Sequence, residues 1–250
     1  MIDIDQSRQG SPVLAGITDR LVSSIEGIGF GPPVAFAYNP LVYARQSWDL
    51  YCARFGLSPR KVLLVGLNPG PFGMAQVGVP FGEISAVRDW MGIVAPVGRP
   101  RAEHPARPIL GFQCTRSEVS GRRLWGWAMD GWTTADRFFE TFFVTNYCPL
   151  VFMESSGRNL TPDKLPPSVR NALFSACDIA IRDTVTHFKP EFVMGMGTVT
   201  ATRLREALDG FGVTVGQVPH PSPANPAANR GWGELMDRSM AQIGISRPRG

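Results

Sequence analysis

Four short apolar segments, spaced by longer helix-like stretches, constrain the fold of this chain more than any other feature. The first three are almost continuously apolar, which is typical of strands buried on both faces of a sheet, and the fourth begins a further strand. The four segments are residues 61–65, 142–144, 192–194 and 213–215. Strands that alternate with helices form a parallel sheet with helices on both faces. The sequence therefore predicts an α/β fold with a central four-stranded parallel sheet.

Capping signals place the helices around these strands. Ser11-Pro12 and Asn39-Pro40 each combine an N-cap residue with a proline at the first helical position, and predict helices ending near residues 27–29 and 56. Further helices are expected at residues 83–91, from Thr133 or Thr134 to 140, at 166–188, at 198–208 and after 232. Residues 94–124 hold many Pro, Gly and Arg residues, so we expect them to be irregular.

The length and composition suit one soluble domain spanning residues 1–250, with a flexible N-terminal stretch of about ten residues. That stretch is polar and does not resemble a signal peptide. No apolar run approaches the roughly 20 residues of a membrane helix. We therefore expect an intracellular protein without a membrane partner, located in the bacterial cytoplasm or nucleoid, or in a eukaryotic nucleus.

The net charge and the cysteines indicate which binding partners and cofactors are compatible with this chain. The net charge of +4 and the pI near 9.1 are compatible with nucleic acid binding, and arginines supply all but three of the 25 basic residues. The four cysteines form no CxxC pair, and their spacing matches no zinc or cluster pattern. We expect buried reduced thiols, with no metal and no cofactor.

Three polar side chains follow predicted strands at the edge where such sheets bind ligands. Asn68, Asn146 and His220 each stand at or just beyond a strand's carboxyl end, and these ends meet at one edge of a parallel sheet. Each has an ordinary structural explanation alone: Asn68 lies in an Asn-Pro-Gly turn, for example. That explanation weakens when three such residues share one edge.

Together these residues match the needs of an enzyme that cuts the bond between a pyrimidine and its sugar. A neutral His220 can donate a hydrogen bond to O2 of the departing base anion. Asn146 can donate to O4 and accept from N3–H of uracil, a pattern that rejects cytosine. Asn68 can hold the attacking water. Phe81 or Phe72 can stack on the extruded ring.

Several long motifs in the same order also resemble a known family. They are Gly66-Leu-Asn-Pro-Gly-Pro-Phe-Gly-Met74, Pro80-Phe-Gly-Glu83, Ser117-Glu-Val-Ser-Gly121, Asn146-Tyr-Cys-Pro-Leu150, Ser156-Gly-Arg-Asn-Leu-Thr-Pro162 and His220-Pro-Ser-Pro223 with the residues up to Trp232. Over residues 35–240 the chain resembles the single-strand-selective monofunctional uracil-DNA glycosylases.

The resemblance implies a three-layer α/β/α sandwich and base excision repair by base flipping, with water as the nucleophile and an abasic site as the product. It assigns the same roles to Asn68, Asn146, His220 and Phe81. It implies that Gly70, with Met74 nearby, leaves room for 5-hydroxymethyluracil and similar bases. We expect a monomer that contacts single- and double-stranded DNA. The residues expected to contact DNA are Ser117, Ser222, Asn225 and Arg230.

Two positions depart from the family pattern. Ala224 stands where the family has an arginine that wedges into the duplex, and Leu67 replaces a methionine of vertebrate members. Because flipping a base costs less from mismatches and single strands, Ala224 predicts a preference for unpaired or mispaired uracil and weaker retention of the abasic product.

Other functions stay open at this point. A non-catalytic module that binds uracil or damaged DNA would share the same pocket residues. A carboxylate-driven hydrolase would use Glu83 or Asp89, although both lie near a predicted helix start, where acidic residues are favoured electrostatically. A phosphate-binding NTPase lacks support, because the loop after residue 66 has no GxxxxGK[ST] pattern.

Overall fold

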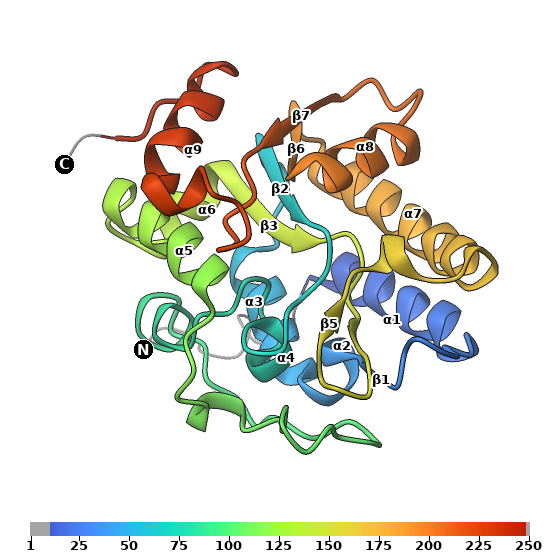
Figure 1. Ribbon diagram of the computed structural model, residues 1–250. Coiled ribbons are helices and arrows are strands. Elements are labelled where there is room, and N and C mark those ends of the chain that lie inside the picture. The colour runs from blue at the N-terminus through green and yellow to red at the C-terminus, as the bar shows by residue number, and fades with distance from the viewer. Residues whose placement is uncertain (1–10, 249–250) are drawn as a thin grey trace.

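The computed structural model describes residues 11–248, and its centre is a four-stranded parallel sheet (Figure 1). The strands lie in the order β3, β2, β6, β7, and every neighbouring pair is parallel. Their bounds are β2 Val62–Gly66, β3 Phe142–Asn146, β6 Phe192–Met196 and β7 Thr214–Val218. These are the four apolar segments that the sequence identified as strands, each extended toward its carboxyl end.

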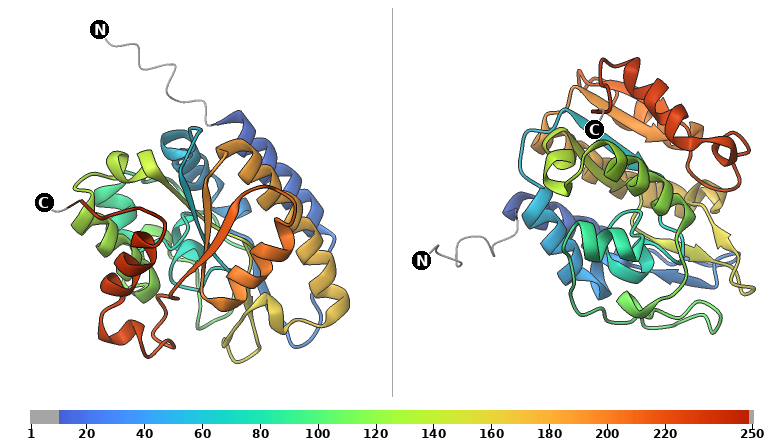
Figure 2. Two further views of the ribbon diagram at one scale, coloured as in Figure 1. Left: turned by 90° about the horizontal axis from the view of Figure 1, so that it is seen from above. Right: turned by 90° about the vertical axis from the view of Figure 1, so that its left-hand side faces the viewer.

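Helices cover both faces of this sheet and complete the three-layer sandwich (Figure 2). One face carries α1 (Pro12–Glu26), α7 (Pro167–Phe188) and α8 (Thr198–Ala207). The other carries α5 (Val119–Gly131), α6 (Ala135–Thr141) and α9 (Trp232–Ala241). The central strands β2 and β6 are almost wholly buried, which explains why they show no alternation of polar and apolar residues.

The predicted N-caps are confirmed. Ser11 accepts a hydrogen bond from Leu14 N, Asn39 from Leu41 N, and Thr134 from Arg137 N. The helix that Asn39 opens is divided in two at Ala44, giving α2 (Pro40–Tyr43) and α3 (Arg45–Phe55). The predicted helix near residues 83–91 contains a π-helical turn, Ala86–Trp90.

Two parts of the fold differ from the sequence expectation. The region 94–124 is not irregular throughout, because α5 begins inside it at Val119. A second, antiparallel sheet of three very short strands was not predicted; it pairs β4 (Val151–Met153) with β1 (Phe36–Tyr38) on one side and β5 (Asn159–Leu160) on the other. The remaining short elements are α4 Met74–Val77 and the 3-10 helices Gly111–Gln113, Pro162–Lys164 and Ala228–Arg230.

All four cysteines are buried and unpaired, in agreement with the expected reduced thiols. In the part of the chain that the structure describes, no helix has both the length and the apolar character to cross a membrane. The predicted flexible stretch of about ten N-terminal residues lies outside the described residues.

Candidate active site

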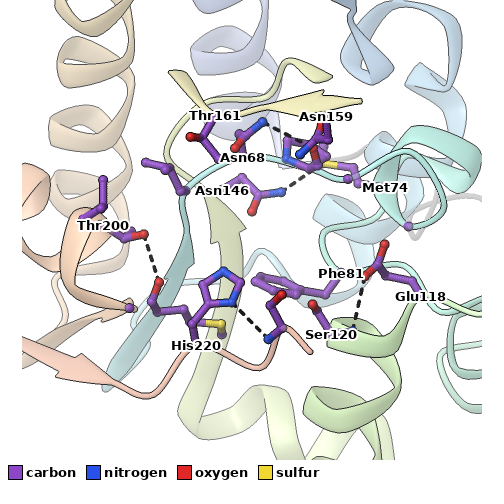
Figure 3. A pocket seen from close by; sticks show the side chains of 18 of the residues that line it. Asn68, Met74, Phe81, Glu118, Ser120, Asn146, Asn159, Thr161, Thr200 and His220 are labelled. Atoms are coloured by element: carbon purple, nitrogen blue, oxygen red, sulfur yellow. Dashed lines mark hydrogen bonds between the residues drawn. The ribbon is translucent and has the colours of Figure 1, made fainter. Parts of the chain in front are cut away.

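A cavity of about 590 Å³ opens at the carboxyl edge of the central sheet (Figure 3). Its volume lies in the range of small-molecule sites. The loops that follow β2 and β7, the end of β3 and the turn between β6 and α8 all contribute to its wall. Asn68, Asn146 and His220 line this one cavity, as the sequence analysis expected of them.

His220 is held in one tautomer by its own loop. Its Nδ1 accepts a hydrogen bond from the backbone N–H of Ser222, at 3.0 Å. Because Nδ1 accepts, the neutral ring carries its proton on Nε2. Burial lowers the pKa of His220 from its ordinary value, so the neutral form predominates at pH 7. The site therefore contains a neutral imidazole N–H donor.

Asn146 ends β3 directly opposite Gly66 of β2. Its Nδ2 lies 3.3 Å from Sδ of Met74, toward which it donates. A Cβ at Gly66 would clash with Asn146 Oδ1 and would lie 2.7 Å from Cζ of Phe81. Glycine at position 66 thus allows the Asn146 amide and the Phe81 ring to approach the strand end closely.

The amide of Asn68 has a fixed orientation. Its Nδ2 donates to the carbonyl oxygens of Leu150, at 3.1 Å, and Pro69, at 3.3 Å. Carbonyl groups only accept, so the amide nitrogen must face them and the oxygen is left to face elsewhere. Asn68 Oδ1 can therefore accept a hydrogen bond from a water molecule in the cavity.

Of the two aromatic candidates, Phe81 lines the cavity and Phe72 does not. The Phe72 ring instead packs against the guanidinium of Arg116, whose Cζ lies 4.4 Å from the ring centroid. Phe81 has a left-handed backbone with φ of 54°, a conformation that costs a bulky residue roughly 1–3 kcal/mol. Its carbonyl accepts from Trp125 Nε1 at 2.9 Å and from Glu83 N at 2.7 Å, and these bonds hold the ring in place.

Glu118 is a pocket residue that the sequence analysis did not single out. It is the N-cap of α5, and its Oε1 accepts from Ser120 N at 3.2 Å. Burial raises the pKa of Glu118, the contact with Ser120 lowers it, and the charge of Glu83 raises it; the net shift is upward. A Cβ at Gly70 would lie 3.2 Å from Glu118 Oε2, so this carboxyl group and Gly70 are direct neighbours.

The residues expected to contact DNA lie in different settings. Ser222 lines the cavity, and Arg230 is exposed at the end of a 3-10 helix. Asn225 is engaged inside its own loop, where Nδ2 donates to His220 O at 3.0 Å. Ser117 donates to Glu83 Oε2 at 3.0 Å and does not line the cavity.

The catalytic carboxylates of the competing hydrolase hypothesis lie outside the cavity. Glu83 accepts hydrogen bonds from Ser117 Oγ and, at 2.7 Å, from Glu118 N, so it anchors the chain before α5. Asp89 is exposed and pairs with Arg88 at 2.7 Å. Within residues 11–248, no group of three His, Cys, Asp or Glu side chains is arranged to hold a metal ion.

The sequence analysis also missed residues at the outer part of the cavity. Their positions are Asn159, Thr161, Asp163, Lys164 and residues 197–200, where α8 begins. The motif around Asn159 was noticed, but only the antiparallel pairing of β4 with β5 brings it to the cavity. Lys164 is highly exposed, and its Nζ lies 3.1 Å from Asp163 Oδ2, so this lysine is an ion-paired residue of the rim.

Comparisons with known proteins agree with this geometry. Residues 55–242 match the family model of the uracil DNA glycosylase superfamily. Over 228 residues the chain is 43% identical to the single-strand selective monofunctional uracil DNA glycosylase of Mus musculus, covering 90% of this chain and 82% of that protein. The protein of the same description from Rattus norvegicus is 44% identical, with the same coverage, and the one from Bos taurus is 42% identical, with 90% and 84% covered.

A solved structure shares the fold. The crystal structure of wild-type SMUG2 from Pedobacter heparinus superposes with a TM-score of 0.63 and covers 91% of this chain and 97% of its own, at 15% identity. The family model spans most of the chain, and the mammalian relatives are similar over nine-tenths of it. The chain therefore belongs to the uracil DNA glycosylase superfamily, and within it to the single-strand selective monofunctional uracil DNA glycosylases.

Proposed function

We propose that this protein hydrolyses the N-glycosidic bond of uracil and 5-substituted uracils in DNA, leaving an abasic site for base excision repair. The observation that carries the proposal is the convergence of Asn68, Asn146 and His220 on one cavity (Figure 3). A pyrimidine reaches such a cavity only after rotating out of the base stack, so the proposal includes base flipping. No cofactor or metal takes part in the proposed reaction.

The bound base is recognised on its Watson–Crick edge and on its face. Asn146 donates through Nδ2 to O4 of uracil and accepts through Oδ1 from N3–H. Cytosine presents the reverse pattern and is rejected. Its N4 amino group would place a donor against the donor Nδ2, and its N3 would place an acceptor against the acceptor Oδ1. The Phe81 ring stacks on the base. The hydrogen bonds to the Phe81 backbone carbonyl hold this residue in position when the base enters and leaves.

Bond cleavage moves charge onto the base and then consumes a water molecule. The C1′–N1 bond breaks, its electron pair passes to the base, and the sugar becomes oxocarbenium-like. His220 donates from Nε2 to O2, where negative charge develops; removing such a donor typically costs a factor of about 10²–10³ in rate. Water held by Asn68 Oδ1 then forms a bond to C1′ through its oxygen and loses a proton. That proton ends on the departing uracil anion, so the products are neutral uracil and a C1′ hydroxyl.

The wall around Gly70 decides which 5-substituents enter. Gly70 has no side chain, and Met74, which lines the same cavity, has an unbranched side chain of the kind that adapts to its neighbours, so this end of the cavity has room for a group on C5. A larger residue at position 70 would fill that space. The proposed substrates therefore include 5-hydroxymethyluracil and similar oxidised uracils.

The loop after β7 is proposed to contact the DNA strand through Ser222 and Arg230, with a single protein molecule acting as one domain. Asn225 shapes that loop from inside, through its bond to His220 O. Ala224 is exposed on it and is too short to fill the gap that a flipped base leaves. The proposal therefore includes a preference for unpaired or mispaired uracil.

One experiment separates this function from a module that binds uracil-containing DNA without cutting it. The purified protein is incubated with oligonucleotides that contain uracil, 5-hydroxymethyluracil or cytosine at one position, paired and unpaired. The proposal predicts free base and an alkali-labile abasic site from the first two bases and none from cytosine. Tight binding without base release would favour the binding module instead.

A further inference from the structure

The Glu118 carboxyl group faces the cavity. Its Oε1 accepts a hydrogen bond from Ser120 N at 3.2 Å, and the Ser120 side chain also contacts the carboxyl group. Oε2 points toward Gly70, whose Cβ, if present, would lie 3.2 Å away. Gly73 makes similar room, because its Cβ would lie 3.0 Å from Glu118 Cγ. The absence of side chains at Gly70 and Gly73 thus allows this carboxyl group to pack into the cavity wall.

The position of Glu118 relative to the base follows from the order of the residues around Phe81. In Figure 3, His220 lies on one side of the Phe81 ring and Glu118 on the other, with Asn146 and Met74 between them along the far edge. In the proposed binding mode O2 faces His220, and N3 and O4 face Asn146. C5 follows C4 around the ring, so a group on C5 points to the wall that Gly70 and Glu118 form.

We propose that Glu118 is a specificity-determining residue that hydrogen-bonds, through Oε2, a hydroxyl group carried on the 5-substituent of the flipped pyrimidine. This inference rests on the proposed function and names a substrate feature that the same site selects. A hydroxyl group donates to a carboxylate and accepts from a protonated carboxyl, so the bond forms in either ionisation state of Glu118.

The same geometry sets an order among substituents. A methyl group, as in thymine, fills the space, displaces water from the carboxyl oxygen and offers it no hydrogen bond in return, which is costly. A carboxylate substituent is repelled by Glu118 whenever that side chain is ionised. The hydroxymethyl group alone among these three fits the space and pairs with Glu118, so it is excised fastest.

The test measures the ratio of single-turnover excision rates for 5-hydroxymethyluracil and uracil in the same single-stranded oligonucleotide. Glu118→Ser keeps a side chain able to cap α5 and removes the carboxyl group from the wall. We expect this ratio to fall about 10- to 100-fold, the usual effect of losing a hydrogen bond to a charged group. Glu118→Gln keeps a polar atom in place and should restore part of the ratio.

Glu83→Gln is the matched control, because it removes the neighbouring charge outside the cavity; its ratio should stay within about threefold of wild type. Circular dichroism and thermal unfolding establish that each variant is folded. Equal loss for both bases in Glu118→Ser, or an unchanged ratio, overturns the inference while leaving the proposed function intact. Failure of the wild-type protein to release uracil at all would instead overturn the proposed function.

Discussion

The backbone N–H of Ser222 donates to Nδ1 of His220 over 3.0 Å, and this contact fixes the proton of the imidazole on Nε2. A single backbone group thereby determines which ring nitrogen can serve the substrate. Gly197, which lies between β6 and α8, supports the same arrangement, because a Cβ there would lie 3.2 Å from His220 Cβ. The donor that we propose for O2 of the base is therefore fixed before substrate arrives.

The activity should depend on pH in a direction that this contact defines. Burial lowers the pKa of His220 from its ordinary value of 6.5, so the neutral ring is the major form at and above that pH. Protonation at Nδ1 would set two N–H groups of His220 and Ser222 against each other and loosen the loop. We predict that the single-turnover rate falls toward acidic pH with a midpoint below 6.5, the ordinary pKa of histidine. A midpoint at or above pH 6.5 would contradict this view of His220.

Gly66→Ala should damage the site more than the fold. The new Cβ would clash with Asn146 Oδ1 and lie 2.7 Å from Phe81 Cζ, so both side chains must shift. Misplacing catalytic groups by about 1 Å costs on the order of 100-fold in rate, whereas overpacking costs about 1–3 kcal/mol of stability. Uracil release and thermal unfolding, measured in parallel, separate the two effects.

Gly126→Ala in α5 is the matched control, because a Cβ there meets no atom within 4 Å. This substitution should leave the rate of uracil release unchanged and should raise stability by about 0.5–1 kcal/mol, as expected in a helix. If Gly66→Ala were as active as this control, the close packing of Asn146 and Phe81 against β2 would not matter for catalysis.

Ala224→Arg should strengthen the hold on the product. Ala224 is exposed on the loop after β7, so a longer side chain there meets no obstacle at the surface. An inserted arginine would occupy the gap in the base stack, and we predict about tenfold tighter binding of abasic duplex DNA, equivalent to about 1.4 kcal/mol. The preference for unpaired over paired uracil should shrink as well. Unchanged affinity for abasic DNA would refute the role assigned to this position.

Much of the architecture could be predicted because the central strands are apolar on both faces and end in loops rich in Gly and Pro. That pattern gave the parallel sheet, and the sheet in turn placed Asn68, Asn146 and His220 at one edge. Helix α5 was missed because Gly121, Gly126 and Gly131 lower its intrinsic helix propensity. Tertiary packing overrides this: a Cβ at Gly121 would clash with the carbonyl oxygen of Phe81.

The outer part of the site could not be predicted for a different reason. Strands β1, β4 and β5 are two or three residues long, too short to show a period, so nothing in the sequence brought Asn159 to the cavity. Glu118 caps α5, but glutamate is not one of the preferred N-cap residues, so the residue type did not indicate this role. Its position beside Gly70 exists only in three dimensions. The residues alone left Phe72 and Phe81 as equal candidates, and the family resemblance favoured Phe81. The structure separates them, because the Phe72 ring packs against Arg116.

The most direct test of the account compares Asn68→Ala with Glu83→Gln in single-turnover release of uracil from single-stranded DNA. Asn68 faces the cavity as an amide that can hold water, whereas Glu83 binds Ser117 and Glu118 N outside it. We predict that Asn68→Ala loses at least about 100-fold in rate. Glu83→Gln should stay within a few-fold of wild type. A larger loss of rate in Glu83→Gln than in Asn68→Ala, or full activity in Asn68→Ala, would contradict a mechanism in which two amides and an imidazole catalyse the reaction.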